Sequence, residues 1–183
     1  SYIPTDLDED GIEDSIDNEV VLTVSKTLSA GSYKFLNLTI SNGATLFLDS
    51  DVDLPGDFKG AEINVANLTV EGGAKISADG KGYGSYQGPG YSGTGAGSSY
   101  GGLGEAAGRE VAPTYGSAVE PIDLGSGGIN GASGGGVIRI IASDTVINNG
   151  TISSNASYGD GATGGSVFVT TNRLEGTGSF LAN

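Results

Sequence analysis

The sequence lacks cysteine, histidine, methionine and tryptophan, and it has few basic residues. Without cysteine it can form no disulfide, no thiolate nucleophile and no Cys-ligated zinc site. Its 8 Lys and Arg residues against 22 Asp and Glu residues give a formal net charge of −14. This balance argues against nucleic-acid binding, because neutralising phosphates needs clustered basic side chains. No continuous apolar run approaches the length of a membrane span, so none is predicted.

The missing residue types also restrict catalysis. Without His or Cys, the remaining catalytic groups are carboxylates, Ser, Tyr, Lys and Arg. Arg139 and Arg173 fall in or beside predicted strands but align with no column of acidic residues, and Glu120 and Asp123 have no evident partner. The sequence therefore predicts that the protein is not an enzyme. Polysaccharide-active enzymes with parallel β-helices leave such an enzyme as a remote alternative, by analogy of fold alone.

A short phrase occurs four times, at residues 33–49, 63–79, 138–155 and 167–183. In each copy apolar residues alternate with polar ones, which turns one face of a β-strand inward. A single copy is too short to bury that face, so neighbouring copies are expected to stack roughly 4.7 to 4.9 Å apart. A β-branched run at residues 20–25 predicts one more strand, as a cap or first rung.

Aligning the copies predicts vertical columns of matched residues. The columns are Ile40, Val70, Val146 and Leu174; Leu46, Ile76, Ile152 and Phe180; and Leu48, Ala78, Ser154 and Ala182. The copies open with the apolar pairs Tyr33/Phe35, Ile63/Val65, Ile138/Ile140 and Val167/Val169. We therefore predict an all-β fold, a β-solenoid of the parallel β-helix-like type, in residues 20–183. An antiparallel β-sandwich or jelly roll is the alternative, since it also has short strands and glycine-rich turns.

A Gly- and Tyr-rich insertion at residues 80–134 separates the second copy from the third. A loop of this length is either functional or disordered. Its aromatic side chains can lie flat on a sheet face or stand out as stacking platforms for sugar rings. They are Tyr83, Tyr86, Tyr91, Tyr100 and Tyr115. The alternative function is therefore a glycan- or partner-binding module that uses this insertion.

Residues 1–19 form a predicted calcium-binding acidic loop. Carboxylates recur along it from Asp6 to Asp17, and Gly11 permits a sharp bend between them. This spacing wraps a short loop around one hard cation, because alternate side chains point inward. Calcium is the expected ion. The alternative is a solvated acidic tail.

Residues 6–18 resemble a thrombospondin type 3 calcium repeat, whose pattern is Asp-x-Asp-x-Asp-Gly-x-x-Asp-x-x-Asp-Asn. The resemblance implies these metal ligands: the side chains of Asp6, Asp8, Asp10, Asp14 and Asp17, and the backbone carbonyl of Ile12. An EF-hand fits less well, since Asp17 stands where that loop has Glu and no amphipathic helix flanks it. Glu19 replaces the family's usual Cys, which removes the disulfide of that family.

A possible second metal site follows the first copy. Its residues are Asp49, Asp51, Asp53 and Asp57. Alternate carboxylates on a strand face one side and repel one another unless they are solvated or bridged by a cation. An acidic loop on the solvent face is an equally good interpretation.

Four Asn-x-Ser/Thr sequons are present. Asn149 and Asn155 flank the turn and the end of the third copy, where an N-linked glycan could project. Asn37 and Asn67 occupy matching positions and are expected to form a hydrogen-bonded ladder of stacked amides.

The glycine-rich phrases at residues 115–128 and 134–140 resemble those of large predicted surface proteins of bacteria and archaea. That resemblance implies an extracellular or cell-surface location and a repetitive architecture, with no catalytic activity. The predicted function is thus an extracellular structural protein: a calcium-stabilised segment of a cell-surface stalk or adhesin, or a filament subunit. The fourth copy carries no capping helix, so we expect head-to-tail contact with a second copy or with further repeats of a longer chain.

Overall fold

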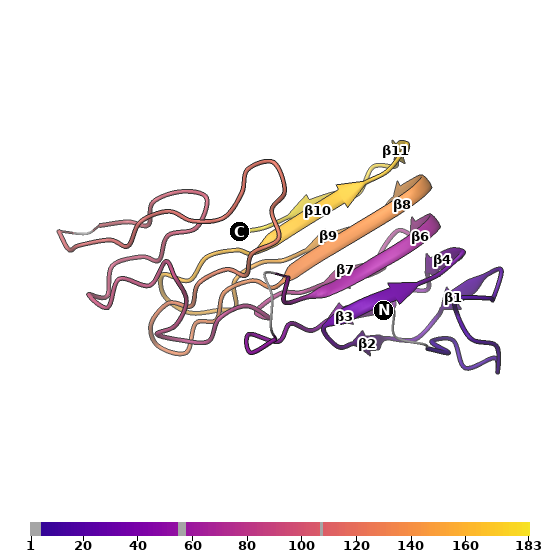
Figure 1. The fold of residues 1–183 in the computed structure, drawn as a ribbon, viewed down its shortest axis with the longest axis horizontal. Coiled ribbons are helices and arrows are strands. Elements are labelled where there is room, and N and C mark those ends of the chain that lie inside the picture. The colour runs from indigo at the N-terminus through magenta and orange to yellow at the C-terminus, as the bar shows by residue number, and fades with distance from the viewer. Residues whose placement is uncertain (1–4, 55–57, 107) are drawn as a thin grey trace.

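The computed structural model describes residues 5–54, 58–106 and 108–183. These residues form an all-β structure with no helix, in which twelve strands make two sheets (Figure 1). Every pairing between the described strands is parallel. This arrangement does not match the antiparallel sandwich or jelly roll that was the alternative.

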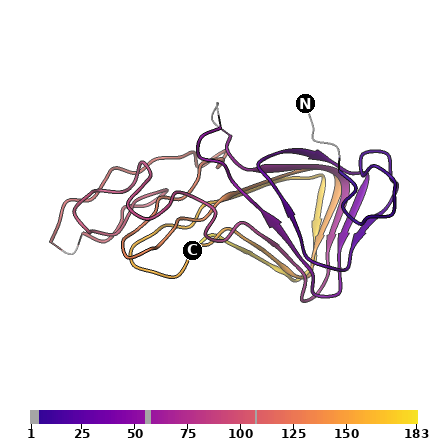
Figure 2. The ribbon, with the colours of Figure 1, turned by 90° about the horizontal axis from the view of Figure 1, so that it is seen from below.

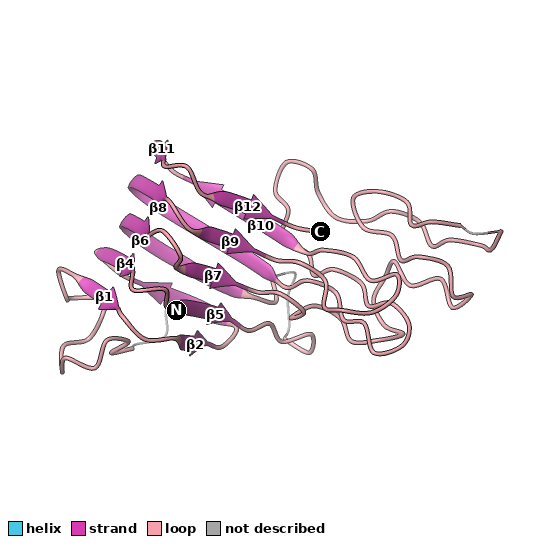
Figure 3. Ribbon diagram, turned by 180° about the vertical axis from the view of Figure 1, so that it is seen from behind, coloured by secondary structure: helices cyan, strands magenta, loops and turns pink. Residues whose placement is uncertain are grey.

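Both sheets follow the order of the chain. The first sheet runs β1 (Val20–Leu22), β4 (Asn37–Ile40), β6 (Ala61–Val70), β8 (Val137–Asn148) and β10 (Ser166–Thr170), with β3 (Gly31–Lys34) beside β6 and β11 (Arg173–Glu175) beside β8. The second runs β2 (Lys26–Leu28), β5 (Thr45–Leu48), β7 (Lys75–Ser77), β9 (Thr151–Ser153) and β12 (Ser179–Leu181) (Figure 3).

Each passage of the chain through the first sheet and then the second is called a coil below. The coils are β1–β2, β3–β5, β6–β7, β8–β9 and β10–β12. Seen from below, the strands of successive coils lie behind one another (Figure 2). The strand predicted at residues 20–25 is confirmed for Val20–Leu22, which form β1 and, with β2, the first coil.

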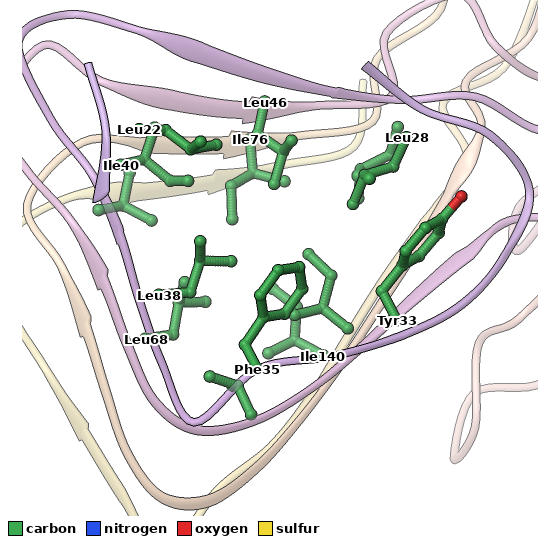
Figure 4. Packing of buried hydrophobic residues seen from close by; sticks show 14 of the residues in the cluster. Leu22, Leu28, Tyr33, Phe35, Leu38, Ile40, Leu46, Leu68, Ile76 and Ile140 are labelled. Atoms are coloured by element: carbon green, nitrogen blue, oxygen red, sulfur yellow. The ribbon is translucent and has the colours of Figure 1, made fainter. Parts of the chain in front are cut away.

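Apolar side chains fill the space between the two sheets (Figure 4). Ile40, Leu46, Leu68, Ile76 and Ile140 are all fully buried there. Ile40, Leu46 and Leu68 occupy the inward positions of strands whose burial alternates along the chain, as the period of two predicts. Burying a side chain of this size contributes roughly 1.5 to 3 kcal/mol, so these residues provide much of the stability of the stack.

One predicted column is confirmed in the second sheet. Leu46 pairs with Ile76, Ile76 with Ile152, and Ile152 with Phe180. The column of Leu48, Ala78, Ser154 and Ala182 comes one position after the pairs Phe47–Ser77, Ser77–Ser153 and Ser153–Leu181.

In the first sheet the predicted match between the second and third copies is wrong. Val70 pairs with Asn148, whereas Val146 pairs with Leu68. Ile63 likewise pairs with Ile140 rather than with Ile138. A slide of two residues leaves every side chain on its original face, so the alternation of apolar residues cannot detect it.

Residues 78–136 contain no strand in their described part and extend to one side of the stack (Figures 1 and 2). Their segments are joined by backbone hydrogen bonds, such as Gly82 N to Gly134 O at 2.8 Å. They approach so closely that a Cβ added to Gly90 would lie 1.8 Å from Ser99 O. Glycine is therefore required at such positions because only backbone fits between the segments.

The same segments are tied to the connection between β9 and β10. Ser98 N donates to Gly161 O at 2.7 Å, and Ile129 N donates to Asp160 O at 2.8 Å. The insertion therefore packs on the last two coils.

Candidate metal site

The acidic loop, residues 5–19, is attached to the first coil. The side chain of Leu7 is only 6% exposed and belongs to the core between the sheets. The backbone N–H of Val21, in β1, donates to Asp8 Oδ2 at 3.2 Å. Lys26 in β2 forms an ion pair with Glu9. The loop is therefore part of the folded N-terminal end of the stack.

All five predicted carboxylates come together in two overlapping groups. One contains Asp6, Asp8 and Asp14, the other Asp8, Asp10 and Asp17, and in each group one oxygen per residue lies within 4.8 Å of the others. Calcium binds oxygen at about 2.3 to 2.6 Å, so two ligands of one ion lie no more than about 5 Å apart. Either group could hold a metal ion, and Asp8 belongs to both.

The backbone folds around these carboxylates through short-range hydrogen bonds. Gly11 N donates to Asp6 Oδ2 at 3.1 Å, and Ile12 N donates to Asp10 Oδ1 at 2.8 Å. Gly11 has a φ of 93°, a conformation that side chains disfavour, which explains the glycine. The side chain of Ile12 is 44% exposed, and the role of its carbonyl as a ligand stays a prediction.

Two carboxylate oxygens in the loop are buried without a hydrogen-bond partner, Asp8 Oδ1 and Asp17 Oδ2. Asp17 is only 8% exposed, and its other oxygen accepts from Glu19 N at 3.1 Å. Leaving a buried charged oxygen unsatisfied is unfavourable unless a donor or a cation is supplied. The donor set, all carboxylate oxygen, fits a hard divalent cation.

Asp14 holds the loop together from inside. It is fully buried, and it accepts hydrogen bonds from Leu7 N at 2.9 Å and from the Thr5 hydroxyl. Burial raises the pKa of Asp14, the hydrogen bonds from Leu7 and Thr5 lower it, and the charges of Asp8 and Asp6 raise it further. A cation beside it would favour the charged form.

The described residues of the predicted second metal site do not form a comparable group. Asp49 forms an ion pair with Lys81 at 2.6 Å. Asp51 Oδ1 accepts from the backbone N–H of Asp53 at 3.0 Å. Asp57 lies outside the described residues. Within residues 49–54, no group of three carboxylates approaches metal-binding spacing.

Two of the five predicted stacking tyrosines, both half-buried, contact each other. The rings of Tyr100 and Tyr115 lie 4.8 Å apart, and Tyr115 Oη donates to Leu124 O at 2.7 Å. The Tyr100 hydroxyl bonds to the hydroxyl of Ser166, in β10. Tyr100 therefore joins the insertion to the last coil, and Tyr115 packs against it from within the insertion, in agreement with the packing interpretation of these two tyrosines.

The other three differ in exposure. Tyr86 is 55% exposed, while Tyr83 and Tyr91 are half-buried. Tyr86 has a positive φ of 66°, and its ring meets Tyr91 edge to face at 5.8 Å. Its hydroxyl accepts from the backbone N–H of Asn130 at 3.3 Å.

The predicted amide ladder is confirmed, since Asn67 Nδ2 donates to Asn37 Oδ1 at 2.9 Å. Of the two candidate glycan sites, Asn149 is exposed. Asn155 is half-buried and its Oδ1 accepts from Asn183 N at 2.9 Å. Glycosylation of either stays a prediction.

Sequence reasoning missed the residues that anchor the acidic loop. Leu7 is the only apolar residue between Asp6 and Asp10, and that isolation was the available signal. Val21 carried no signal, because its contribution is a backbone N–H.

No protein-family model matches the chain, and neither a search of curated proteins nor one of solved structures finds a significant match. Among the described residues, no helix has the length and apolar character needed to cross a membrane.

Proposed function

We propose that this chain is a calcium-stabilised structural segment of an extracellular stalk or adhesin, built as a parallel β-solenoid. The observation that supports it most directly is the pair of buried, unpartnered oxygens of Asp8 and Asp17, in a loop that is packed on the first coil. A cation there would join the loop to the stack and neutralise part of the repulsion among five carboxylates.

The stack itself suits a structural role. Parallel pairing continues through all five coils in both sheets, and the amide ladder of Asn37 and Asn67 follows the same direction. Such an architecture is extended by adding coils, each of which contacts mainly its neighbours. Extracellular modules commonly bind calcium with dissociation constants of about 10⁻⁴ to 10⁻³ M, which matches a site that acts as a structural clamp.

Calcium titration calorimetry and thermal unfolding test this proposal. Saturation at about 100 times the dissociation constant is expected to raise the free energy of unfolding by about 2.7 kcal/mol. Asp17→Asn should lose most of that gain. Asp144→Asn is the matched control, because Asp144 is an exposed acid in β8 far along the chain from the loop. Identical unfolding curves in calcium and in chelator would contradict the calcium site.

A glycan-binding module is the second candidate function, and the exposed ring of Tyr86 favours it. Asn130, which bonds to the Tyr86 hydroxyl, also donates through Nδ2 to Asp160 Oδ2 at 2.8 Å. An exposed ring beside an amide and a carboxylate can stack on a sugar and bond its hydroxyls. Binding to an oligosaccharide array should be lost in Tyr86→Ala and kept in Tyr158→Ala, since Tyr158 is a fully exposed ring with no hydrogen bond to Tyr86 or Asn130 among the described contacts.

A further inference from the structure

The two ends of the stack present their sheet edges differently. At the N-terminal end, Ser41 N donates to Leu22 O at 2.9 Å, so the backbone groups of Leu22 face β4. Successive residues of a strand direct their N–H and C=O groups to opposite sides, so those of Val21 face away from β4. The outward N–H of Val21 is the one that Asp8 accepts. The acidic loop therefore accepts the hydrogen bond of the central N–H on the free edge of β1.

The C-terminal end is open within the described residues. Ser179 N donates to Gly150 O at 3.0 Å, so the backbone of Phe180 faces away from β9. No described strand pairs with β12 on that side. Leu174, Phe180 and Leu181 are 55%, 40% and 37% exposed. This edge combines unpaired backbone with apolar side chains, the properties that favour pairing with another chain.

We propose that residues 5–19 act as a cation-locked cap on the β1 edge, and that removing the cation lets this edge pair with the β10–β12 edge of a second copy. The proposal rests on the metal site of the proposed function. The N-terminal edge carries β1 and β2, and the C-terminal edge carries β10, β11 and β12; all of these strands pair in parallel with the coil next to them. Stacking the first coil of one copy on the last coil of another would therefore continue both sheets in parallel.

The cap depends on the cation because its carboxylates carry like charges and lie close together. Leu7 is its buried apolar anchor in the core cluster, and the Lys26–Glu9 ion pair is largely solvent-exposed on the Glu9 side. Against these act five carboxylates held in two tight groups. Without a cation, their mutual repulsion favours release of the loop and exposes Val21 N–H.

Sedimentation velocity and negative-stain electron microscopy of the full chain, in calcium and in chelator, test the proposal. We expect monomers in calcium, and head-to-tail oligomers in chelator that dissociate when calcium is restored. Monomers in both calcium and chelator would overturn the cap, while a calcium site shown by calorimetry would stand. Oligomers that form only in calcium would also overturn it.

Two variants make the result specific. Phe180→Pro removes the outward N–H of β12, a substitution that an edge strand tolerates, and should keep the protein monomeric in chelator. Phe180→Ala, which removes the same ring but keeps the N–H, should still assemble. Leu7→Asp should release the cap and allow assembly even in calcium. Equal assembly of Phe180→Pro and Phe180→Ala in chelator would rule out pairing through the β12 edge.

Discussion

The stacked coils and the Gly- and Tyr-rich insertion are held together by different kinds of packing. The core cluster between the sheets is made of side chains from the coils and the acidic loop, and it includes none from the described residues 79–136. In the insertion, backbone packs on backbone, as where a Cβ on Gly127 would lie 1.9 Å from Gly84 O. One chain thus uses the hydrophobic effect in one region and backbone hydrogen bonding with close glycine contacts in the other.

This difference explains why the insertion is ordered despite its composition. Glycine loses more backbone entropy on folding than any other residue, and it buries no side chain in return. That loss is offset by the hydrogen bonds between segments, by the contact between the Tyr100 and Tyr115 rings, and by the bond from Tyr100 to Ser166 in β10. Tyrosine supplies the buried apolar area that glycine lacks.

The largest effect is expected in the side-chain core. Ile76→Ala should lower the free energy of unfolding by about 4 kcal/mol, because Ile76 is fully buried and a cavity would remain. Phe180→Ala, in the same column but 40% exposed, should cost about 1 kcal/mol. Urea denaturation of both variants measures the difference, and equal losses would show that the columns do not share one interior.

A smaller effect is expected in the backbone-packed region. Gly90→Ala should cost about 3 kcal/mol, because its Cβ would overlap Ser99 O and the segments would have to separate. Gly101→Ala is the matched control, since no atom lies within 4 Å of its added Cβ, and it should stay within about 0.5 kcal/mol of the parent. Thermal unfolding measures the difference, and equal melting temperatures of the two variants would contradict close glycine packing.

The smallest effect lies where the two regions meet and depends on pH. Burial, the largest cause, raises the pKa of Tyr115 to about 12, against about 10 for an exposed tyrosine. The unfolded chain therefore loses this proton first, so the stability is fully present below about pH 10 and is lost as the pH rises toward 12. Between about pH 8 and about pH 11 the loss should be about 1 kcal/mol.

Tyr115→Phe checks this assignment. Urea denaturation at both pH values should show a smaller loss in this variant than in the parent, whereas Tyr158→Phe should behave like the parent because Tyr158 is fully exposed. An unchanged pH dependence in Tyr115→Phe would mean that another group titrates.

Much of the fold could be predicted from the repeated phrase. Its period of two identified the inward faces of the strands, and the Leu46–Ile76–Ile152–Phe180 column followed from it. The pairing of β6 with β8 could not be predicted, because the register shifts at Val65/Asn67 and β9 follows β8 after a shorter turn. A periodic pattern tolerates such slides, and only the hydrogen bonds select one of them.

The candidate metal site could likewise be predicted only in part. The spacing of the acids from Asp6 to Asp17 identified the carboxylates that the fold brings together. Their attachment to the stack through Leu7 and the N–H of Val21 was invisible in that spacing. It depends on which edge of β1 remains free, a property of the assembled sheet.

The sequence by itself determined which side chains face inward and which acids cluster, because both depend on residues close together in the chain. Tertiary structure alone decided the register between distant copies, the close packing of the glycines and the docking of the acidic loop on β1. The register and the docking depend on backbone N–H and C=O groups, which nearly every residue type carries, and the sequence shows where glycines lie but not which segments they let meet.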